Sequence, residues 1–254
     1  MKIALVQYSP VWENPKETII KINKLLESTD LIDVSLLVFP EMSLTGFTMD
    51  SKTFAEELDG TSYKYFMNLS KRIKKHIFAG IIERDGKNIY NSLIHFDDMG
   101  VIRIIYRKIH PFSYADEDEN YNAGSEPFIT KIKDINFGLS ICYDLRFPEL
   151  FRIYGKQQVD VLINIANWPE TRIAHWDKLL QARAIENQCY VIGVNRVGDD
   201  KHLHYPGHSS LVNPMGEVIV SCLEENIEIV EIDKAEVNSI REKLPFLNDI
   251  KLIK

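Results

Sequence analysis

Short runs of consecutive apolar residues alternate along this chain with longer stretches in which apolar residues recur every three or four positions. The first pattern predicts buried strands and the second predicts amphipathic helices. Residues 3–8 and 34–39 are short runs, and the stretch that begins at Asn14-Pro15 has helical spacing with proline at the first helical position. The remaining predicted elements are strands over 77–82, 89–96, 101–106, 135–141, 159–165 and 189–194, and helices over 63–76, 148–158 and 173–188. After residue 208 the pattern predicts two or three more strands and a short C-terminal helix.

The order of these elements favours a layered α/β fold, because strands alternate with helices. Tight turns at Asp85-Gly86 and Met99-Gly100 join strands directly, which indicates mixed sheets with helices on their outer faces. We expect residues 1–254 to form a single domain, with the last ~15 residues as a C-terminal extension, because no linker interrupts the pattern. The stretch 108–127 has no clear period, and loops of that length are usually functional or disordered.

Charge and hydropathy make some classes of function less favoured for this protein. A net charge of −7 disfavours nucleic-acid and anionic membrane partners, since phosphates are neutralised by clustered lysine and arginine. The basic run 71–75 is interpreted as the solvated end of a helix. The first apolar run is broken by Gln7, and no apolar stretch reaches the ~18 residues needed to cross a bilayer, so we expect a cytoplasmic protein. Three cysteines in that compartment do not form a disulfide framework.

Three chemically active side chains follow predicted strands. Glu41, Lys108 and Cys142 stand just after the strands 34–39, 101–106 and 135–141. Side chains at strand ends converge on a ligand crevice in layered α/β folds, so a carboxylate, an ammonium and a thiol meet if these strands are neighbours that point the same way. Taken alone, Cys142 is a small residue of the kind that is usually buried core, and Cys189 and Cys222 are interpreted as core residues.

Together the three groups make a complete thiol chemistry. A thiol of pKa about 8.5 needs activation at neutral pH, which a nearby lysine supplies electrostatically and a carboxylate supplies as general base. Cys142 lies at a predicted strand-to-helix turn, where backbone N–H groups and the helix dipole can hold a developing oxyanion.

Several segments resemble the nitrilase superfamily of carbon–nitrogen hydrolases. The segments that carry this resemblance are FPEMSLTGF (39–47), RKIHPF (107–112), ICYDLRFPELFR (141–152), ANWP (166–169), HWDKLLQARAIENQCYVIGVNRVG (175–198) and GHSSLVNPMGEV (207–218). The resemblance implies a four-layer α-β-β-α sandwich that pairs into a homodimer. We expect no cofactor and no metal.

The family pattern assigns roles to residues of this chain. Glu41 is then the general base and acid, Lys108 stabilises the tetrahedral intermediate, and Cys142 is the nucleophile, with the Tyr143 N–H as a second oxyanion donor. A second glutamate is implied in the loop 115–124, where Glu117 fits the spacing and Glu119 is the alternative.

The run CYDLRFPEL, with ANWP and ARAIENQ, is most similar to the omega-amidase branch. These enzymes hydrolyse the terminal amide of 2-oxo acid amides such as 2-oxoglutaramate or 2-oxosuccinamate through a thioester, and release ammonia. A substrate carboxylate needs a cation, and the candidates are Arg146, Arg172 and Arg196. Arg146 is alternatively a structural partner of Asp144 or Glu149, and Trp168 is a candidate pocket wall or a core aromatic.

Other interpretations stay open. The histidines of segment 202–208 have a spacing that can hold zinc, and His110 or His175 can act as base in a Cys–His hydrolase. A non-catalytic binding module on the same fold is a further alternative. Within the superfamily the rivals are a deaminated-glutathione amidase, an N-carbamoyl amino acid hydrolase and a nitrilase.

Overall fold

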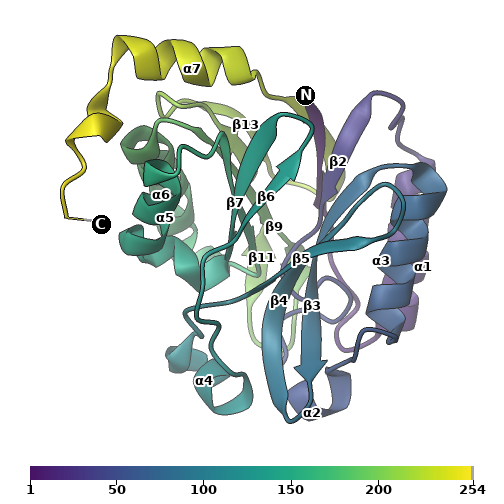
Figure 1. The fold of residues 1–254 in the computed structure, drawn as a ribbon. Coiled ribbons are helices and arrows are strands. Elements are labelled where there is room, and N and C mark those ends of the chain that lie inside the picture. The colour runs from purple at the N-terminus through teal and green to yellow at the C-terminus, as the bar shows by residue number, and fades with distance from the viewer. Residues whose placement is uncertain (253–254) are drawn as a thin grey trace.

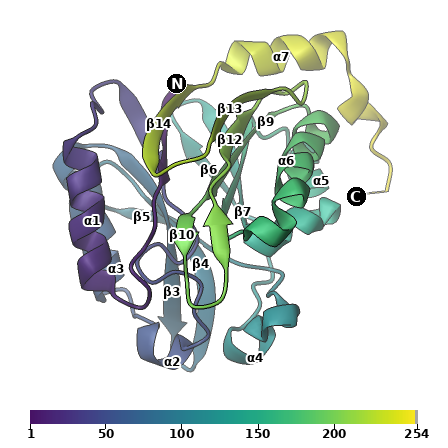
Figure 2. The ribbon, with the colours of Figure 1, turned by 180° about the vertical axis from the view of Figure 1, so that it is seen from behind.

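The computed structural model of the chain describes residues 1–252, so residues 253 and 254 of the predicted C-terminal extension lie outside the described part. Two mixed sheets lie face to face between two pairs of helices (Figures 1 and 2). The predicted α-β-β-α sandwich is therefore confirmed.

The first sheet is built mainly from the N-terminal half of the chain. Its strands, in spatial order, are β14 (Asn226–Glu231), β1 (Lys2–Gln7), β2 (Val34–Val38), β3 (His76–Asp85), β4 (Asn88–Phe96) and β5 (Ile102–Arg107). Helices α1 (Pro15–Glu27) and α3 (Thr61–Ile73) cover its outer face (Figure 1). The predicted start of α1 is confirmed, because Pro15 is its first residue and the Asn14 side chain accepts a hydrogen bond from the Glu17 N–H.

The second sheet is built from the C-terminal half. Its strands, in spatial order, are β13 (Val218–Cys222), β12 (Ser209–Val212), β9 (Tyr190–Asn195), β8 (Val161–Ala166), β7 (Ile135–Ile141) and β6 (Ile129–Ile132). Helices α5 (Pro148–Lys156) and α6 (Ile173–Asn187) cover its outer face, and α7 (Lys234–Lys243) crosses one end of the molecule (Figure 2).

The buried apolar side chains form separate layers that explain this arrangement. One cluster lies between the sheets and joins residues such as Leu36 and Phe78 of the first sheet to Phe137 and Ile163 of the second. Two further clusters fill the space between each sheet and its own helices. Central strands such as β8 are buried on both faces, which is why they are continuous apolar runs in the sequence.

Some short elements have no counterpart in the predicted pattern. They are α2 (Ser51–Phe54), the hairpin β10 (Val197–Asp199) and β11 (His204–Pro206), and, inside the aperiodic stretch 108–127, the 3₁₀ turn η1 (Ser113–Ala115) and α4 (Glu117–Asn120). Each has at most four residues, which is too short for a periodic signal. Within residues 1–252, none of the helices is both long enough and apolar enough to cross a bilayer.

Candidate active site

Glu41, Lys108 and Cys142 approach one another from both sheets. Glu41 follows β2 and Lys108 follows β5, and these strands are separated by β3 and β4 in the first sheet, whereas Cys142 follows β7 in the second. The three strands are therefore not neighbours, so the condition under which the sequence would bring these side chains together is not met. The side chains meet because the two sheets pack face to face, so strand ends of both sheets open onto the same region.

The centre of the site is a buried cluster of charges. The Lys108 ammonium donates to Glu41 Oε1 at 2.9 Å and to Glu117 Oε2 and Oε1 at 2.8 and 3.0 Å. The side chains of Lys108, Glu41 and Glu117 are 2%, 0% and 0% exposed, so these interactions are almost completely shielded from water. Glu119 lies on the exposed side of α4, so the structure brings Glu117 rather than Glu119 into the cluster.

Burial and charge act against each other in this cluster. Burial disfavours the charged form of Lys108, but the carboxylates of Glu117 and Glu41 outweigh it and raise the pKa of Lys108 well above its ordinary value. Burial raises the pKa of Glu117, and the Lys108 ammonium opposes that shift. The ammonium is thus held charged, and burial favours the protonated form of the Glu117 carboxyl.

Cys142 stands between this cluster and solvent. It is partly buried, and its backbone has the positive φ of 44°, an uncommon conformation for a residue other than glycine. Burial raises the pKa of its thiol well above the ordinary value, the Glu41 carboxylate adds to the shift, and Lys108 and a hydrogen bond from the Asn167 backbone oppose it. The resting thiol is therefore protonated and needs a base.

The turn after β7 differs from the predicted one. Residues Cys142–Arg146 form a 3₁₀ helix, η2, and the α-helix α5 begins only at Pro148. The dipole of an α-helix therefore does not begin at Cys142, because this short 3₁₀ helix intervenes. The backbone N–H of Tyr143 lies within η2, and the Tyr143 ring lines the adjacent cavity.

Two asparagines that sequence reasoning missed complete the cluster. Asn91 Nδ2 donates to Glu41 Oε1 at 2.7 Å and to Glu117 Oε1 at 2.9 Å. The Asn167 backbone N–H donates to Glu41 Oε2 at 2.9 Å, and Asn167 Nδ2 donates to the Glu41 main-chain oxygen at 2.8 Å. Asn167 directly follows the apolar strand β8. A polar residue just after an apolar strand is the signal that identified the three predicted residues, so the same signal could have identified Asn167. Asn91 lies within a strand and carries no such signal.

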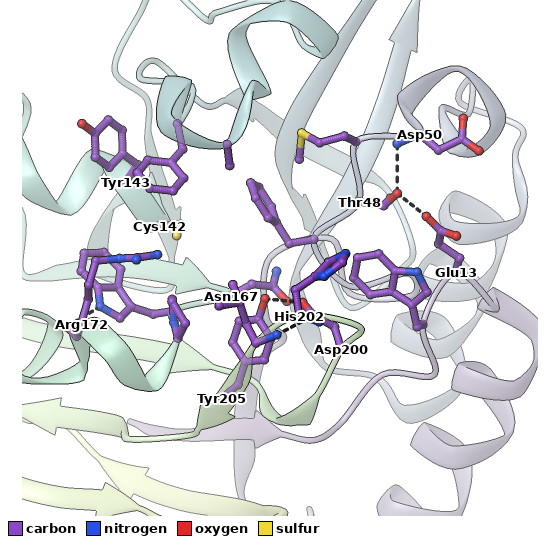
Figure 3. A pocket seen from close by; sticks show the side chains of 18 of the residues that line it. Glu13, Thr48, Asp50, Cys142, Tyr143, Asn167, Arg172, Asp200, His202 and Tyr205 are labelled. Carbon is purple, nitrogen blue, oxygen red and sulfur yellow. Dashed lines mark hydrogen bonds between the residues drawn. The ribbon is translucent and has the colours of Figure 1, made fainter.

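A cavity of about 380 Å³ opens above Cys142 (Figure 3). Arg146, Arg172 and Trp168 line it, and the Arg146 guanidinium lies 4.8 Å from the centre of the Trp168 ring. The β10–β11 hairpin supplies another part of the wall, including Tyr205. The cavity thus combines aromatic surface with guanidinium groups next to the thiol.

Arg196 does not belong to this wall. Its side chain is fully buried, donates to the main-chain oxygens of Val197 and Asp199, and lies 4.4 Å from the Tyr205 ring centre. The proposal of Arg196 as a carboxylate ligand is therefore wrong, because the residue supports the β10–β11 hairpin from behind.

Arg146 does not pair with Asp144, whose carboxylate accepts hydrogen bonds from the Tyr106 hydroxyl, the His110 imidazole and backbone N–H groups. The closest polar partner of Arg146 is His175 Nδ1, at 3.3 Å. His110 stacks on Phe147 and His175 faces Arg146, so both imidazoles are engaged away from the cavity lining.

The histidines of segment 202–208 face different partners. His204 pairs with Asp199 and His208 with Asp177, whereas His202 lines the cavity. Within residues 1–252, no group of three or more histidine, cysteine, aspartate or glutamate side chains is arranged to hold a metal ion.

Comparison with known proteins gives consistent matches over nearly the whole chain. Residues 2–242 match the sequence profile described as carbon–nitrogen hydrolase. The 2-oxoglutaramate amidase of Bacillus subtilis (strain 168) is 35% identical over 254 residues, which cover 98% of this chain and 97% of that protein. Omega-amidase YafV of Escherichia coli (strain K12) is 33% identical over 98% of this chain and 96% of that protein.

A solved structure also matches the fold closely. XC1258 from Xanthomonas campestris, a CN-hydrolase superfamily protein with an arsenic adduct in its active site, superposes with a TM-score of 0.93. It is 29% identical, and the alignment covers 100% of this chain and 98% of that one.

Proposed function

The chain belongs to the carbon–nitrogen hydrolase family and is an amidase, and we propose that it cleaves the terminal amide of small 2-oxo acid amides through a thioester on Cys142. The observation that carries this proposal is the buried Glu41–Lys108–Glu117 cluster, whose charges act on Cys142, a residue that itself lines a cavity together with two guanidinium groups. The candidate substrates are 2-oxoglutaramate and 2-oxosuccinamate.

Glu41 is the proposed base for the thiol. The Asn167 backbone N–H donates to Glu41 Oε2, and the Glu41 carboxylate raises the pKa of the Cys142 thiol whereas the Asn167 backbone lowers it, which supports Glu41 as the carboxylate that acts on the thiol. Transfer of the thiol proton to Glu41 produces the nucleophile at the moment of attack on the amide carbon. Lys108 and the Tyr143 N–H are the proposed donors to the oxyanion that forms.

The intermediate then collapses with loss of ammonia. Glu41 returns its proton to the leaving nitrogen, the carbon–nitrogen bond breaks, and a thioester to Cys142 remains. A water molecule attacks this thioester, again with Glu41 as base, which yields the carboxylate product and restores the thiol. Glu117 holds Lys108 in place throughout, through two hydrogen bonds of 2.8 and 3.0 Å.

Arg146 and Arg172 are the proposed ligands of the substrate carboxylate. Both line the cavity, and within residues 1–252 neither forms an ion pair with a carboxylate. Burial lowers the pKa of Arg146, and the positive charge of Arg172 adds to this shift. Two unpaired, mutually repelling cations beside a nucleophile favour an anionic substrate, and a guanidinium binds a carboxylate with two parallel hydrogen bonds.

A substrate panel tests this assignment. Ammonia release is measured with 2-oxoglutaramate, 2-oxosuccinamate, deaminated glutathione, an N-carbamoyl amino acid and a simple nitrile. We expect the two oxo acid amides to have the highest kcat/KM, and Arg146→Gln and Arg172→Gln to raise KM for them about tenfold or more, with little effect on a neutral amide. Preference for any other member of the panel contradicts the substrate class while leaving the hydrolase class intact.

The roles of the side chains are tested separately. Glu41→Gln keeps the size of the side chain but removes the base, so we expect it to be nearly inactive. His110→Asn and His175→Asn serve as matched controls and should retain activity. Loss of activity in a folded histidine variant with activity retained in Glu41→Gln would favour a Cys–His hydrolase. Failure of Cys142 to form a covalent adduct with any amide or thiol reagent would favour a binding module.

We also propose that the protein is a cytoplasmic homodimer. The three cysteines are unpaired, which supports a reducing compartment. Ile185 on α6 is exposed and lies beside Gly216. Met215 and Ile219, close to Gly216 in the sequence, are exposed as well, which supports an apolar surface for contact with a second copy of the chain. Sedimentation equilibrium should give a dimer, and Ile185→Glu should shift it toward monomer; a monomeric wild-type protein at micromolar concentration refutes the assignment.

A further inference from the structure

The buried cluster holds more negative than positive charge. Two carboxylates, Glu41 and Glu117, share one ammonium, Lys108, and all three side chains are almost completely excluded from solvent. Two carboxylates that accept from the same donors in a poorly solvated site disfavour each other's ionisation. A base that is to accept the thiol proton must be ionised, and the site therefore needs uncharged donors in addition to Lys108.

Asn91 supplies such donors at one position. Its amide nitrogen carries two hydrogens and lies 2.7 Å from Glu41 Oε1 and 2.9 Å from Glu117 Oε1, so one N–H is available for each carboxylate. Because both partners only accept hydrogen bonds when ionised, the orientation of the amide group is determined: the nitrogen faces the carboxylates and Oδ1 points away from them.

The remaining atom of this amide is also informative. Asn91 is 1% exposed, and its Oδ1 is buried without a hydrogen-bond partner. The hydrogen bonds of this side chain are therefore those of its amide nitrogen to Glu41 and Glu117. The main chain of Asn91 is independent of this role, because its carbonyl accepts from the Lys108 N–H at 2.8 Å whatever side chain is present.

We propose that Asn91 is a positioning residue for the amidase reaction, which gives one N–H to Glu41 and one to Glu117 and so holds both carboxylates ionised against Lys108. This inference rests on the proposed role of Glu41 as base. Asn91 and Lys108 both donate to Oε1 of Glu41, so Oε2, which accepts from the Asn167 backbone N–H, is the oxygen that we assign to the thiol proton.

The test compares Asn91→Asp and Asn91→Ala with the wild-type protein. Asn91→Asp has nearly the same shape as the wild-type side chain, but it offers one O–H donor at most when protonated and adds a third negative charge when ionised. Asn91→Ala removes both N–H donors. Either change disfavours the ionised carboxylates, and loss of one hydrogen bond from each charged group moves a pKa by about one unit. We therefore expect the acid limb of the kcat/KM profile to move upward by about one pH unit in both variants.

Asn164→Asp is the matched control, since Asn164 is a fully buried asparagine on the central strand β8 whose amide nitrogen donates to Ser140 instead of to the cluster. It should leave the acid limb in place. Unfolding midpoints are recorded for all variants, and Asn91→Ala decides the outcome if Asn91→Asp does not fold, because it introduces no buried acid.

The rate of Cys142 alkylation by iodoacetamide is followed over the same pH range as a readout that needs no substrate. We expect its acid limb to move in parallel with that of kcat/KM in the Asn91 variants. If the wild-type protein releases no ammonia from oxo acid amides, the proposed substrate class fails while alkylation still tests Asn91. An unshifted acid limb in a folded Asn91 variant overturns the proposal.

Discussion

Replacement of Lys108 by methionine tests the electrostatic account of the site most directly. Methionine fills similar volume but has no charge and no donor, so the variant leaves Glu41 and Glu117 buried without their cation. Lys108 makes three N–H···O contacts of 2.8–3.0 Å with these carboxylates. Removal of one partner of a buried ion pair typically costs about 3–5 kcal/mol of unfolding free energy, because the remaining charge is uncompensated.

The loss should depend on pH in a definite direction. Without Lys108 the pKa values of both carboxyls rise, and a carboxyl whose pKa is higher in the folded than in the unfolded state binds more protons when folded. Stability therefore falls as pH rises above the unfolded value of about 4.3, so the variant should be impaired much more at pH 8 than at pH 5.

Thermal unfolding followed by tryptophan fluorescence measures this effect. At pH 8 the expected loss lowers Tm by roughly 10 °C for a chain of this size, and at pH 5 by less than half as much. Lys2→Met is the control, since Lys2 forms an exposed pair with Asp33 at 3.1 Å and its removal should cost at most about 1 kcal/mol. A Tm drop below about 2 °C at pH 8, or an equal drop at both pH values, would refute the reasoning.

Three further substitutions test the nucleophile, the segment that carries Glu41 and a buried histidine. Cys142→Ala should lower ammonia release by at least about 10⁴-fold with a nearly unchanged Tm; substantial residual turnover rules out the nucleophile. Gly80→Ala should lower kcat about 100-fold, because its Cβ would lie 2.4 Å from Met42 N and 2.7 Å from Glu41 Cα and displace that segment; unchanged kcat contradicts this. Burial lowers the pKa of His95 to about 3, so stability should decline as pH falls from about 6.5 toward 3. His95→Gln should flatten that decline, and an equally steep profile in urea titrations shows that another group is responsible.

Local sequence determined the elements and the identity of the reactive groups. The start of α1 at Asn14-Pro15 and the continuous apolar strands follow from capping, proline geometry and burial on both faces, all of which act within a few residues. Glu41, Lys108 and Cys142 were recognisable because each follows an apolar strand, and this signal applies equally to Asn167.

Only the tertiary structure decided how these groups meet. Sequence cannot indicate that the ends of β2 and β5 face the end of β7 across two sheets, because that contact joins segments far apart in the chain and depends on sheet packing. The same limit explains why Asn91 was missed, because it is a polar side chain inside a strand and its two partners come from other segments. It also explains why Arg196 was taken as a candidate ligand, because the sequence does not show that its side chain is buried behind the β10–β11 hairpin. Residue type determines what chemistry is available, and packing determines which groups are desolvated, paired and accessible, which is what sets their reactivity.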